Sequence, residues 1–311
     1  MEQPRLLKQA FLIEDVDETD ATTVTVKSIL TPNGFGGWSL NPYVGCSHAC
    51  AYCYVRRRWK ILEHAGACIQ PWGASVQVKI NAMNRLRDEI KRVASNEGIW
   101  LSSATDAYQP CEALWRHTRK ILEMLVDWDV KITILTKNSL VVRDIDLFRR
   151  FRNLRVGFSI NTLNRHAWEC IEMNSSPPEE RLEALEILQR ERISTFVFMS
   201  PAMPFITDFD TMVPVLAKRT RRVSAETLNL SEGNYASMRE AIHRLMPGHE
   251  QDFWQAVVTR KWGNTIAKQF EPLCKKYGVR FGGFFRNECS RKKLTQMFRD
   301  DPMFDFLKNE E

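Results

Sequence analysis

Three cysteines lie close together in the segment Gly45–Tyr54, which reads GCSHACAYCY. Their spacing is Cys-x3-Cys-x2-Cys, at Cys46, Cys50 and Cys53. Cysteines grouped in this way in a reducing compartment more often hold a metal or do chemistry than form disulfides. An iron–sulfur cluster with four irons takes four ligands, so three cysteines leave one iron open to an exogenous ligand. The spacing therefore favours a catalytic iron–sulfur cluster.

A structural zinc site is the alternative for this segment. Zinc normally takes four protein ligands, and the fourth would come from His48, His64 or Cys68. This alternative predicts a protein without catalytic activity, in which the cysteine loop serves only to hold the fold together. Neither Cys274 nor Cys289 has a companion cysteine nearby, so we expect no second cluster.

The elements that must position this loop follow a recurring pattern, a short apolar run and then an amphipathic stretch. Alternation of this kind predicts parallel strands with right-handed crossovers, and hence an α/β fold. We expect a partial (β/α)6 barrel of the TIM type at 36–232, a lead-in at 1–35, and a helical C-terminal extension at 233–311 packed on the barrel. The predicted strands are Trp38–Val44, Gly98–Ala104, Val130–Thr136, Leu154–Ile160, Ser194–Ser200 and Arg222–Leu228. The predicted helices are Val76–Val93, Leu114–Trp128, Pro178–Glu191, Tyr235–Met246 and Gln251–Tyr277.

Polar residues stand at the ends of three successive predicted strands. In a barrel, the carboxyl ends of the strands meet at one face, and the reactive groups lie there. We therefore expect these side chains to line one shared site. They are Ser102, Ser103, Thr105 and Asp106 after the second strand, Thr136, Lys137 and Asn138 after the third, and Ser159, Asn161 and Thr162 at the fourth.

Longer stretches around these residues carry a family resemblance. They are Ser39–Tyr54 (SLNPYVGCSHACAYCY), Ala104–Glu112 (ATDAYQPCE), Thr118–Arg119, Ile134–Lys137 (ILTK), Arg143–Leu147 (RDIDL) and Gly157–Asn161 (GFSIN). With the cysteine loop after the first strand, they resemble the radical S-adenosylmethionine (SAM) enzymes, in the branch that contains spore photoproduct lyase. The similarity extends over roughly two thirds of the chain, from Ser39 to Asn229.

The resemblance implies cofactors and a reaction. Cys46, Cys50 and Cys53 would hold a [4Fe-4S] cluster whose fourth iron is chelated by SAM. Reductive cleavage of SAM would give a 5′-deoxyadenosyl radical that abstracts hydrogen from the substrate, with flavodoxin or ferredoxin as the electron donor. Asp106 would face the SAM ammonium group and Lys137 its carboxylate, which are sensible charge pairings. Four further matches near SAM or the cluster are Tyr52, Thr105, Ser159 and Asn161.

One position departs from the lyase branch. Spore photoproduct lyase has a hydrogen-donating cysteine where this chain has Ser103, and a serine hydroxyl is unable to replace it. The nearest thiol is Cys111, which we consider as a displaced hydrogen donor, as a thiol near the active site, or as a buried residue at a helix start. This departure argues against transferring spore-photoproduct repair as the activity.

Charge and resemblance together point to a nucleic acid or a nucleotide as substrate. The 44 Lys and Arg residues exceed the 38 Asp and Glu residues, for a net charge of +6. Basic clusters lie at Arg56–Lys60, Lys218–Arg222 and Arg286–Lys293, and Trp59, Trp115 and Trp262 stand beside Arg or Lys. Such groups suit phosphate contact and base stacking, although solvated surfaces and core packing produce the same pattern. Radical modification of a peptide or a small metabolite is the alternative reaction.

Composition excludes several other classes of protein. The chain has 311 residues, of which 44% are hydrophobic and 26% charged, so it is neither disordered nor fibrous. Because no apolar run approaches the length of about 18 residues that a membrane helix needs, we expect no membrane partner. The opening residues, MEQPRLLKQA, lack the pattern of a secretory signal, and we expect a cytoplasmic protein.

Overall fold

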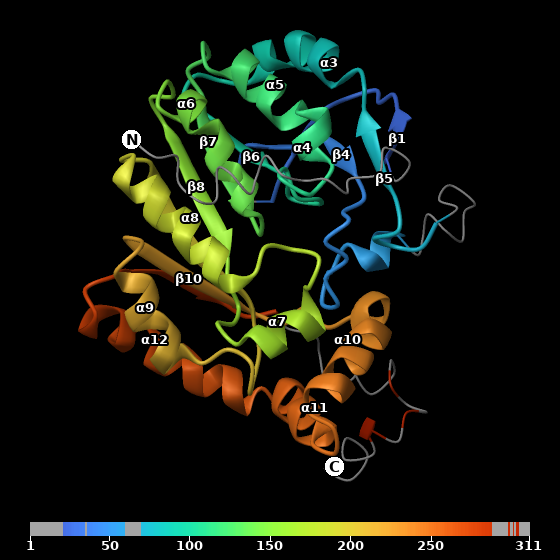
Figure 1. Ribbon diagram of the computed structural model, residues 1–311, viewed down its shortest axis with the longest axis vertical. Coiled ribbons are helices and arrows are strands. Elements are labelled where there is room, and N and C mark those ends of the chain that lie inside the picture. Colours follow the sequence, from blue (N-terminus) through green and yellow to red (C-terminus); the bar gives the residue numbers. More distant parts are fainter. Residues whose placement is uncertain are drawn as a thin grey trace. The chain divides into compact units, whose positions relative to one another are not determined.

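The computed structural model describes residues 21–34, 36–59, 70–287, 298, 301 and 303–304 (Figure 1). It divides the chain into two compact units, each built from segments that are distant in sequence. The first unit comprises Met1–Ala49, Ile69–Ser159 and Asn174–Phe196; the second comprises Cys50–Cys68, Ile160–Met173 and Val197–Glu311. The three consecutive segments expected from the sequence remain a prediction.

The first unit is organised around a run of parallel strands. Its strands are β1 (Ala21–Val24), β2 (Leu30–Pro32), β3 (Trp38–Leu40), β4 (Tyr43–Val44), β5 (Val76–Lys79), β6 (Gly98–Leu101), β7 (Lys131–Thr136) and β8 (Leu154–Ser159). β3, β6, β7 and β8 pair in that order and are parallel, whereas β2 runs antiparallel to β3. A small second sheet joins β1, β5 and β4.

The helices of the first unit connect these strands. They are α3 (Ala82–Glu89), η2 (Ile90–Arg92), α4 (Glu112–Trp115), α5 (His117–Leu125), η3 (Ser139–Asp144), α6 (Ile145–Phe148) and α8 (Pro178–Arg190). α8 begins as predicted, with Pro178 at its start and Glu179 and Glu180 in its first turn, where carboxylates favour the helix dipole. The predicted helix Leu114–Trp128 is instead broken at Arg116, whose φ of 52° lies in the left-handed region.

One predicted helix was partly wrong. Val76–Lys79, expected as the start of a helix, forms strand β5, where buried and half-buried residues alternate. This period of two is the pattern of a strand with one buried face. The strand pairs with β1 on one side and β4 on the other, so hydrogen bonds to distant segments decided its structure.

The second unit repeats the arrangement of strands and helices. β9 (Ser194–Ala202) enters it at Val197 and pairs in parallel with β10 (Arg222–Thr227), which pairs in parallel with β11 (Arg280–Phe285). Its helices are α7 (Arg165–Ile171), α9 (Phe209–Ala217), α10 (Glu232–Leu245), α11 (Glu250–Thr259) and α12 (Lys261–Lys276). α9 and α12 pack together through Phe209 and Phe270, whose ring centroids are 5.0 Å apart.

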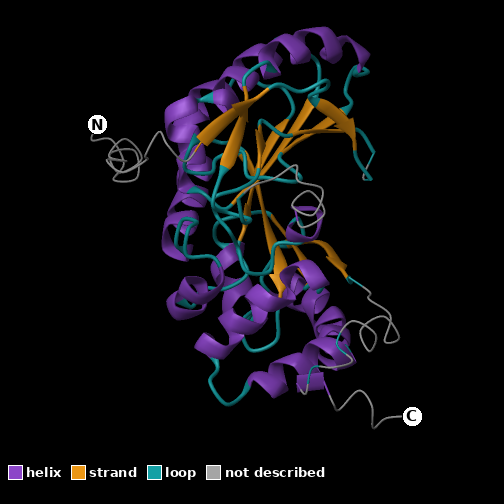
Figure 2. Ribbon diagram, turned by 90° about the vertical axis from the view of Figure 1, so that its right-hand side faces the viewer, coloured by secondary structure: helices purple, strands orange, loops and turns teal. Residues whose placement is uncertain are grey.

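An α/β architecture is thus present, with helices following parallel strands in both units (Figure 2). Every apolar run that the sequence predicts as a strand overlaps at least one, and Trp38–Val44 holds two, β3 and β4. The helical C-terminal region is also present as α10, α11 and α12, and the segment after it adds β11 to the parallel strands of the second unit. Within the described residues, no helix is long and apolar enough to cross a membrane.

Candidate functional site

The cysteine loop follows β4 and begins with a tight turn in the first unit. Gly45 has a φ of 84°, which favours glycine, and its carbonyl accepts a hydrogen bond of 2.5 Å from Thr105 Oγ1. The amide of Ala49 donates to Cys46 O at 3.2 Å and closes the turn. Cys46 is buried and forms no disulfide within the described residues. The hydroxyl of Thr105 thus holds the start of the loop in place.

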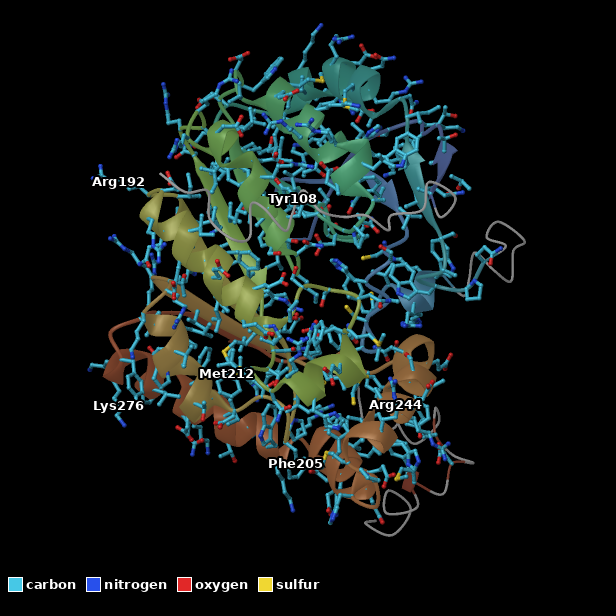
Figure 3. All side chains as sticks on the ribbon, viewed as in Figure 1. Tyr108, Arg192, Phe205, Met212, Arg244 and Lys276 are labelled. Atoms are coloured by element: carbon cyan, nitrogen blue, oxygen red, sulfur yellow. The ribbon has the colours of Figure 1, made fainter. Side chains whose placement is uncertain are left out.

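The rest of the loop belongs to the second unit, where its backbone is held from several sides. The amide of Ala51 donates to the carbonyl of Ile171 at 2.8 Å, and its carbonyl accepts from Ser237 Oγ at 2.7 Å. Asn234 Nδ2 donates to the carbonyl of Tyr52 at 2.9 Å. These bonds come from α7 and α10, which are themselves joined where Arg244 donates to the carbonyl of Cys170 at 3.0 Å (Figure 3). The backbone that carries Cys50 and Cys53 is therefore well anchored.

Tyr52 is the predicted contact on this loop. Its ring is 7% exposed and packs in the apolar core of the second unit with residues of α10 and α11, among them Met238 and Trp254. Its hydroxyl donates to the Glu172 side chain, which is buried as well. These contacts make Tyr52 a residue that seats the loop on its core.

A positive charge lies beside two of the thiols. Arg56 Nε donates to the carbonyl of Cys50 at 3.1 Å. Burial lowers the pKa of Arg56, while the neighbouring sulfur atoms of Cys53 and Cys50 act in the opposite direction. A guanidinium in this position stabilises thiolates, which are the form of cysteine that binds metal.

The donor chemistry of the loop fits an iron–sulfur cluster. Within the described residues, Cys46, Cys50 and Cys53 form no disulfide; two of them are buried and Cys53 is half-buried. In the described part of the chain, no three His, Cys, Asp or Glu side chains already converge as ligands of one metal ion. Metal binding and the final ordering of a ligand loop are commonly coupled.

Asp106 connects the loop after β6 with the end of β7. Its Oδ1 accepts from the amide of Tyr108 at 2.9 Å and from Thr136 Oγ1 at 2.7 Å. Its Oδ2 accepts from the amide of Lys137 at 2.9 Å and lies 3.5 Å from Nδ1 of His48 on the cysteine loop. Both oxygens are thus engaged within the first unit. The predicted contact of Asp106 with SAM remains a prediction.

Asn161 is a buried amide with unused hydrogen-bonding capacity. It follows β8, is 1% exposed, and its carbonyl accepts from Thr207 Oγ1 at 2.7 Å. Neither Nδ2 nor Oδ1 has a hydrogen-bond partner among the residues that the structure describes. Leaving such a buried group unsatisfied costs about 1–3 kcal/mol, so a polar ligand that bonds to it would stabilise the fold. The predicted contact of Asn161 with SAM remains a prediction.

Two other predicted residues lie in the first unit at strand ends. Ser159, 3% exposed at the end of β8, accepts through its carbonyl from the buried Arg181 Nη1 at 2.8 Å. Lys137 follows β7 and is fixed through its amide by Asp106. The ligand roles predicted for Ser159 and Lys137 remain predictions.

Gln109 is a functional candidate that the sequence analysis missed. It is fully buried, its Oε1 accepts from the amide of Ser47 on the cysteine loop at 2.9 Å, and its Nε2 donates to Thr105 Oγ1 at 2.9 Å. Its place in the segment ATDAYQPCE, between Asp106 and Cys111, is the signal that would have drawn attention to it.

Cys111 lies in an apolar cluster of the first unit, with Tyr43, Val76 and Val78. It is 7% exposed and directly precedes α4. Burial, and then the neighbouring charge of Glu112, raise the pKa of its thiol to about 12. These surroundings match the interpretation of Cys111 as a buried residue at a helix start.

Of the three residues named for the fourth ligand of the zinc alternative, only His48 is described. Its Nδ1 lies 3.5 Å from Asp106, and the zinc alternative remains a prediction. His64 and Cys68 lie outside the described residues.

Of the three basic clusters, Arg56–Lys60 is described as far as Trp59, which is 4% exposed and therefore a core residue. In the cluster Arg286–Lys293, only Arg286 and Asn287 are described.

The chain belongs to the radical SAM superfamily, whose family model matches residues 40–213. An uncharacterized protein of Methanocaldococcus jannaschii is 33% identical over 232 residues, which are 74% of this chain and 84% of the relative. A radical SAM Nα-GlyT isomerase of Pseudomonas phage M6 is 25% identical over 170 residues, 54% of this chain and 34% of that protein. The superfamily expected from the cysteine spacing is confirmed.

Solved structures of spore photoproduct lyase have a similar fold. A variant of that enzyme with a dinucleoside spore photoproduct matches with a TM-score of 0.62 at 16% sequence identity, over 85% of this chain and 82% of the other. The lyase complexed with the dinucleoside spore photoproduct matches with a TM-score of 0.60 over the same shares. At this identity the likeness concerns the fold, and at that level it confirms the resemblance to the lyase branch.

Proposed function

We propose that this chain is a radical SAM enzyme that holds a [4Fe-4S] cluster through Cys46, Cys50 and Cys53 and acts on a nucleic acid or a nucleotide. The observation that carries the proposal is the Cys-x3-Cys-x2-Cys loop inside the segment that matches the superfamily, whose three cysteines form no disulfide within the described residues. When bound, the cluster and SAM supply a one-electron cleavage of SAM that ends in hydrogen abstraction from the substrate.

The chain's own residues have separate tasks in this proposal. The backbone bonds to Ala51 and Tyr52 hold the loop, and Arg56 favours the thiolate forms of its neighbours. Asn161 offers an unpaired amide to the polar groups of SAM. Asp106 and Gln109 position the loop from the first unit. A partial (β/α)6 barrel is part of the proposal.

The substrate class rests on the relatives and on charge. Spore photoproduct lyase is bound to a dinucleoside spore photoproduct in the structures that match. The net charge of +6 suits a phosphate-bearing partner, and a flavodoxin or a ferredoxin is the proposed electron donor. Because the donor thiol of the lyase branch is a serine here, Ser103, we do not extend the proposal to spore-photoproduct repair.

The test is reductive cleavage of SAM. The full chain is purified without oxygen, reconstituted with iron and sulfide, reduced with dithionite and assayed for 5′-deoxyadenosine. We expect product from the wild type and none from Cys50→Ala. Cys274→Ala is the matched control, because Cys274 is also a buried free thiol of the second unit but lies on α12.

Each outcome has a distinct meaning. Cleavage by Cys50→Ala at the wild-type rate contradicts the ligand assignment. Wild-type protein that contains zinc and no iron supports the structural-zinc alternative. An intact cluster with no cleavage, even with DNA, RNA or nucleotides present, contradicts the proposed substrate class and leaves a peptide or a small metabolite.

A further inference from the structure

A cavity lies in the second unit at the carboxyl ends of its three parallel strands. Its volume is about 610 Å³, within the usual range for small-molecule sites. Ala202 at the end of β9, Thr227 at the end of β10 and Arg286 just after β11 all line it. Ligands of α/β proteins commonly bind at this end of parallel strands. No residue of the cavity belongs to the sites described above.

The wall of the cavity is positively charged. Arg57, Arg260 and Arg286 line it from three separate segments, and no Asp or Glu is among the described residues that line it. Arg286 is oriented by a hydrogen bond of 3.0 Å from its Nη1 to Asn264 Oδ1. Planar guanidinium groups that converge in this way suit a phosphate.

A carboxylate beside the lining residue Thr227 is already engaged. Glu226, on β10, accepts from Asn287 Nδ2 at 2.9 Å through Oε1 and from Ser200 Oγ at 3.0 Å through Oε2. Asn287 also donates through Nδ2 to the carbonyl of Thr227 at 2.7 Å. Glu226 therefore serves to fix the segment after β11 that carries Arg286.

The start of α12 adds to the preference for an anion. This helix has 16 residues, and Trp262, Gly263 and Asn264 of its first turn line the cavity. Its first intrahelical bond runs from the amide of Asn264 to the carbonyl of Arg260, at 2.9 Å. The amides before it have no partner inside the helix, and no side chain caps them. They add donors to those of the arginines.

Another part of the wall is apolar and carries one indole ring. Trp262 is half-buried, and its ring lies 6.3 Å from that of Phe209, which limits its movement. Leu228, Leu230 and Val257 also line the cavity. A site with arginines and an aromatic surface matches a phosphate joined to a flat base.

We propose that this cavity binds a nucleoside phosphate, with the phosphate on Arg57, Arg260 and Arg286 and the base against Trp262. This proposal rests on the proposed function and narrows its substrate class. It also connects the cavity with the cysteine loop. Arg57 lies in the helical turn that follows Cys53. Gly233, in the first turn of α10, packs against the backbone of this turn. A Cβ atom added to Gly233 would lie only 2.4 Å from the amide nitrogen of Arg57.

The test is binding to the reconstituted full chain without dithionite, so that no turnover occurs. Two probes are used, a fluorescein-labelled single-stranded DNA of about ten nucleotides in an anisotropy assay and thymidine 5′-monophosphate in calorimetry, both at low salt. The double variant Arg57→Ala/Arg286→Ala is compared with Arg58→Ala/Arg221→Ala. All four side chains are exposed, and the second pair removes the same charge away from the cavity.

We expect the first pair to weaken binding by at least about tenfold and the second pair by less than about twofold. If only the DNA binds tightly, the ligand of the cavity is a nucleotide within a DNA strand. If the monophosphate binds, the ligand is a free nucleotide. Both outcomes support a nucleoside phosphate site in this cavity. Equal effects of the two pairs, or no binding of either probe to the wild type, would overturn the proposal.

A second variant tests the base end of the cavity. We expect Trp262→Leu to weaken the binding of thymidine monophosphate but not the binding of inorganic pyrophosphate, which has no base to stack. Equal weakening of both ligands contradicts this part of the assignment. Unfolding midpoints establish that every variant is folded. Because the readout is binding, its failure is separate from failure of the proposed function, which is read as 5′-deoxyadenosine.

Discussion

Replacing Asp106 by Asn tests the argument that this carboxylate braces the cysteine loop. Its two oxygens accept three hydrogen bonds of 2.7–2.9 Å, from Tyr108, Thr136 and Lys137, and one of them also faces His48. Asparagine keeps the shape of the side chain but has a single acceptor oxygen. One amide nitrogen must then face groups that themselves donate.

The expected cost follows from these contacts. A hydrogen bond to a charged group contributes about 1.5–3 kcal/mol, and a buried donor left without an acceptor costs about 1–3 kcal/mol. Asp106 is 6% exposed, so water compensates little of this loss. We expect Asp106→Asn to lower the free energy of unfolding by about 3 kcal/mol.

The measurement is equilibrium unfolding in urea. Asp127→Asn, at an exposed position, is the matched control and should change the free energy of unfolding by less than about 0.5 kcal/mol. Thr136→Val removes one donor to the same carboxylate and should cost about 1 kcal/mol. Because the two groups share one bond, the effects of Asp106→Asn and Thr136→Val should not add.

Two results would refute this reasoning. One is a loss below about 1 kcal/mol for Asp106→Asn, which would mean that the carboxylate is not a structural brace. The other is full additivity with Thr136→Val, which would mean that their hydrogen bond contributes nothing. Either result would favour the alternative in which Asp106 is reserved for the ammonium group of SAM.

Three further predictions concern the first unit. Glu112 is fully buried and accepts a hydrogen bond from Arg143 Nη2 at 2.6 Å. Glu112→Gln should therefore lower the free energy of unfolding, measured in urea, by about 3 kcal/mol. A loss below about 1 kcal/mol would contradict a buried ion pair. Burial lowers the pKa of Lys79 from 10.5 to about 8, so the unfolded chain holds this proton more tightly and stability should increase as the pH rises from 8 to 10.5. Lys79→Met should therefore raise the free energy of unfolding by about 3 kcal/mol at pH 7 and lose this advantage above pH 10.5. An equal gain at pH 7 and above pH 10.5 would show that the lowered pKa of Lys79 is not the cause. Since burial raises the pKa of the Cys111 thiol to about 12, iodoacetamide at pH 8 should label it at least about a hundredfold more slowly in the native protein than in urea, as followed by peptide mass spectrometry; equal rates would show an accessible thiol.

The fold was predictable where the signal is local. Apolar runs placed the parallel strands, and the prolines and glutamates of Pro178–Glu191 placed the start of α8. Prediction failed where distant segments decide the structure. Val76–Lys79 became a strand because β1 and β4 pair with it. Arg116 and Arg260 end helices in left-handed conformations that their residue type does not announce.

The candidate site divides in the same way. The sequence by itself determined the three thiols and their superfamily, because spacing along the chain limits which side chains one cluster can share. It did not determine what the polar residues contact. Only the tertiary structure showed that Asp106 is engaged by groups about 30 residues away, and that Gln109 holds the loop from 62 residues away. It also showed that the buried side-chain amide of Asn161 has no hydrogen-bond partner among the described residues. The cavity near Arg57 and Arg286 also depends on the fold, since packing alone brings such distant segments together.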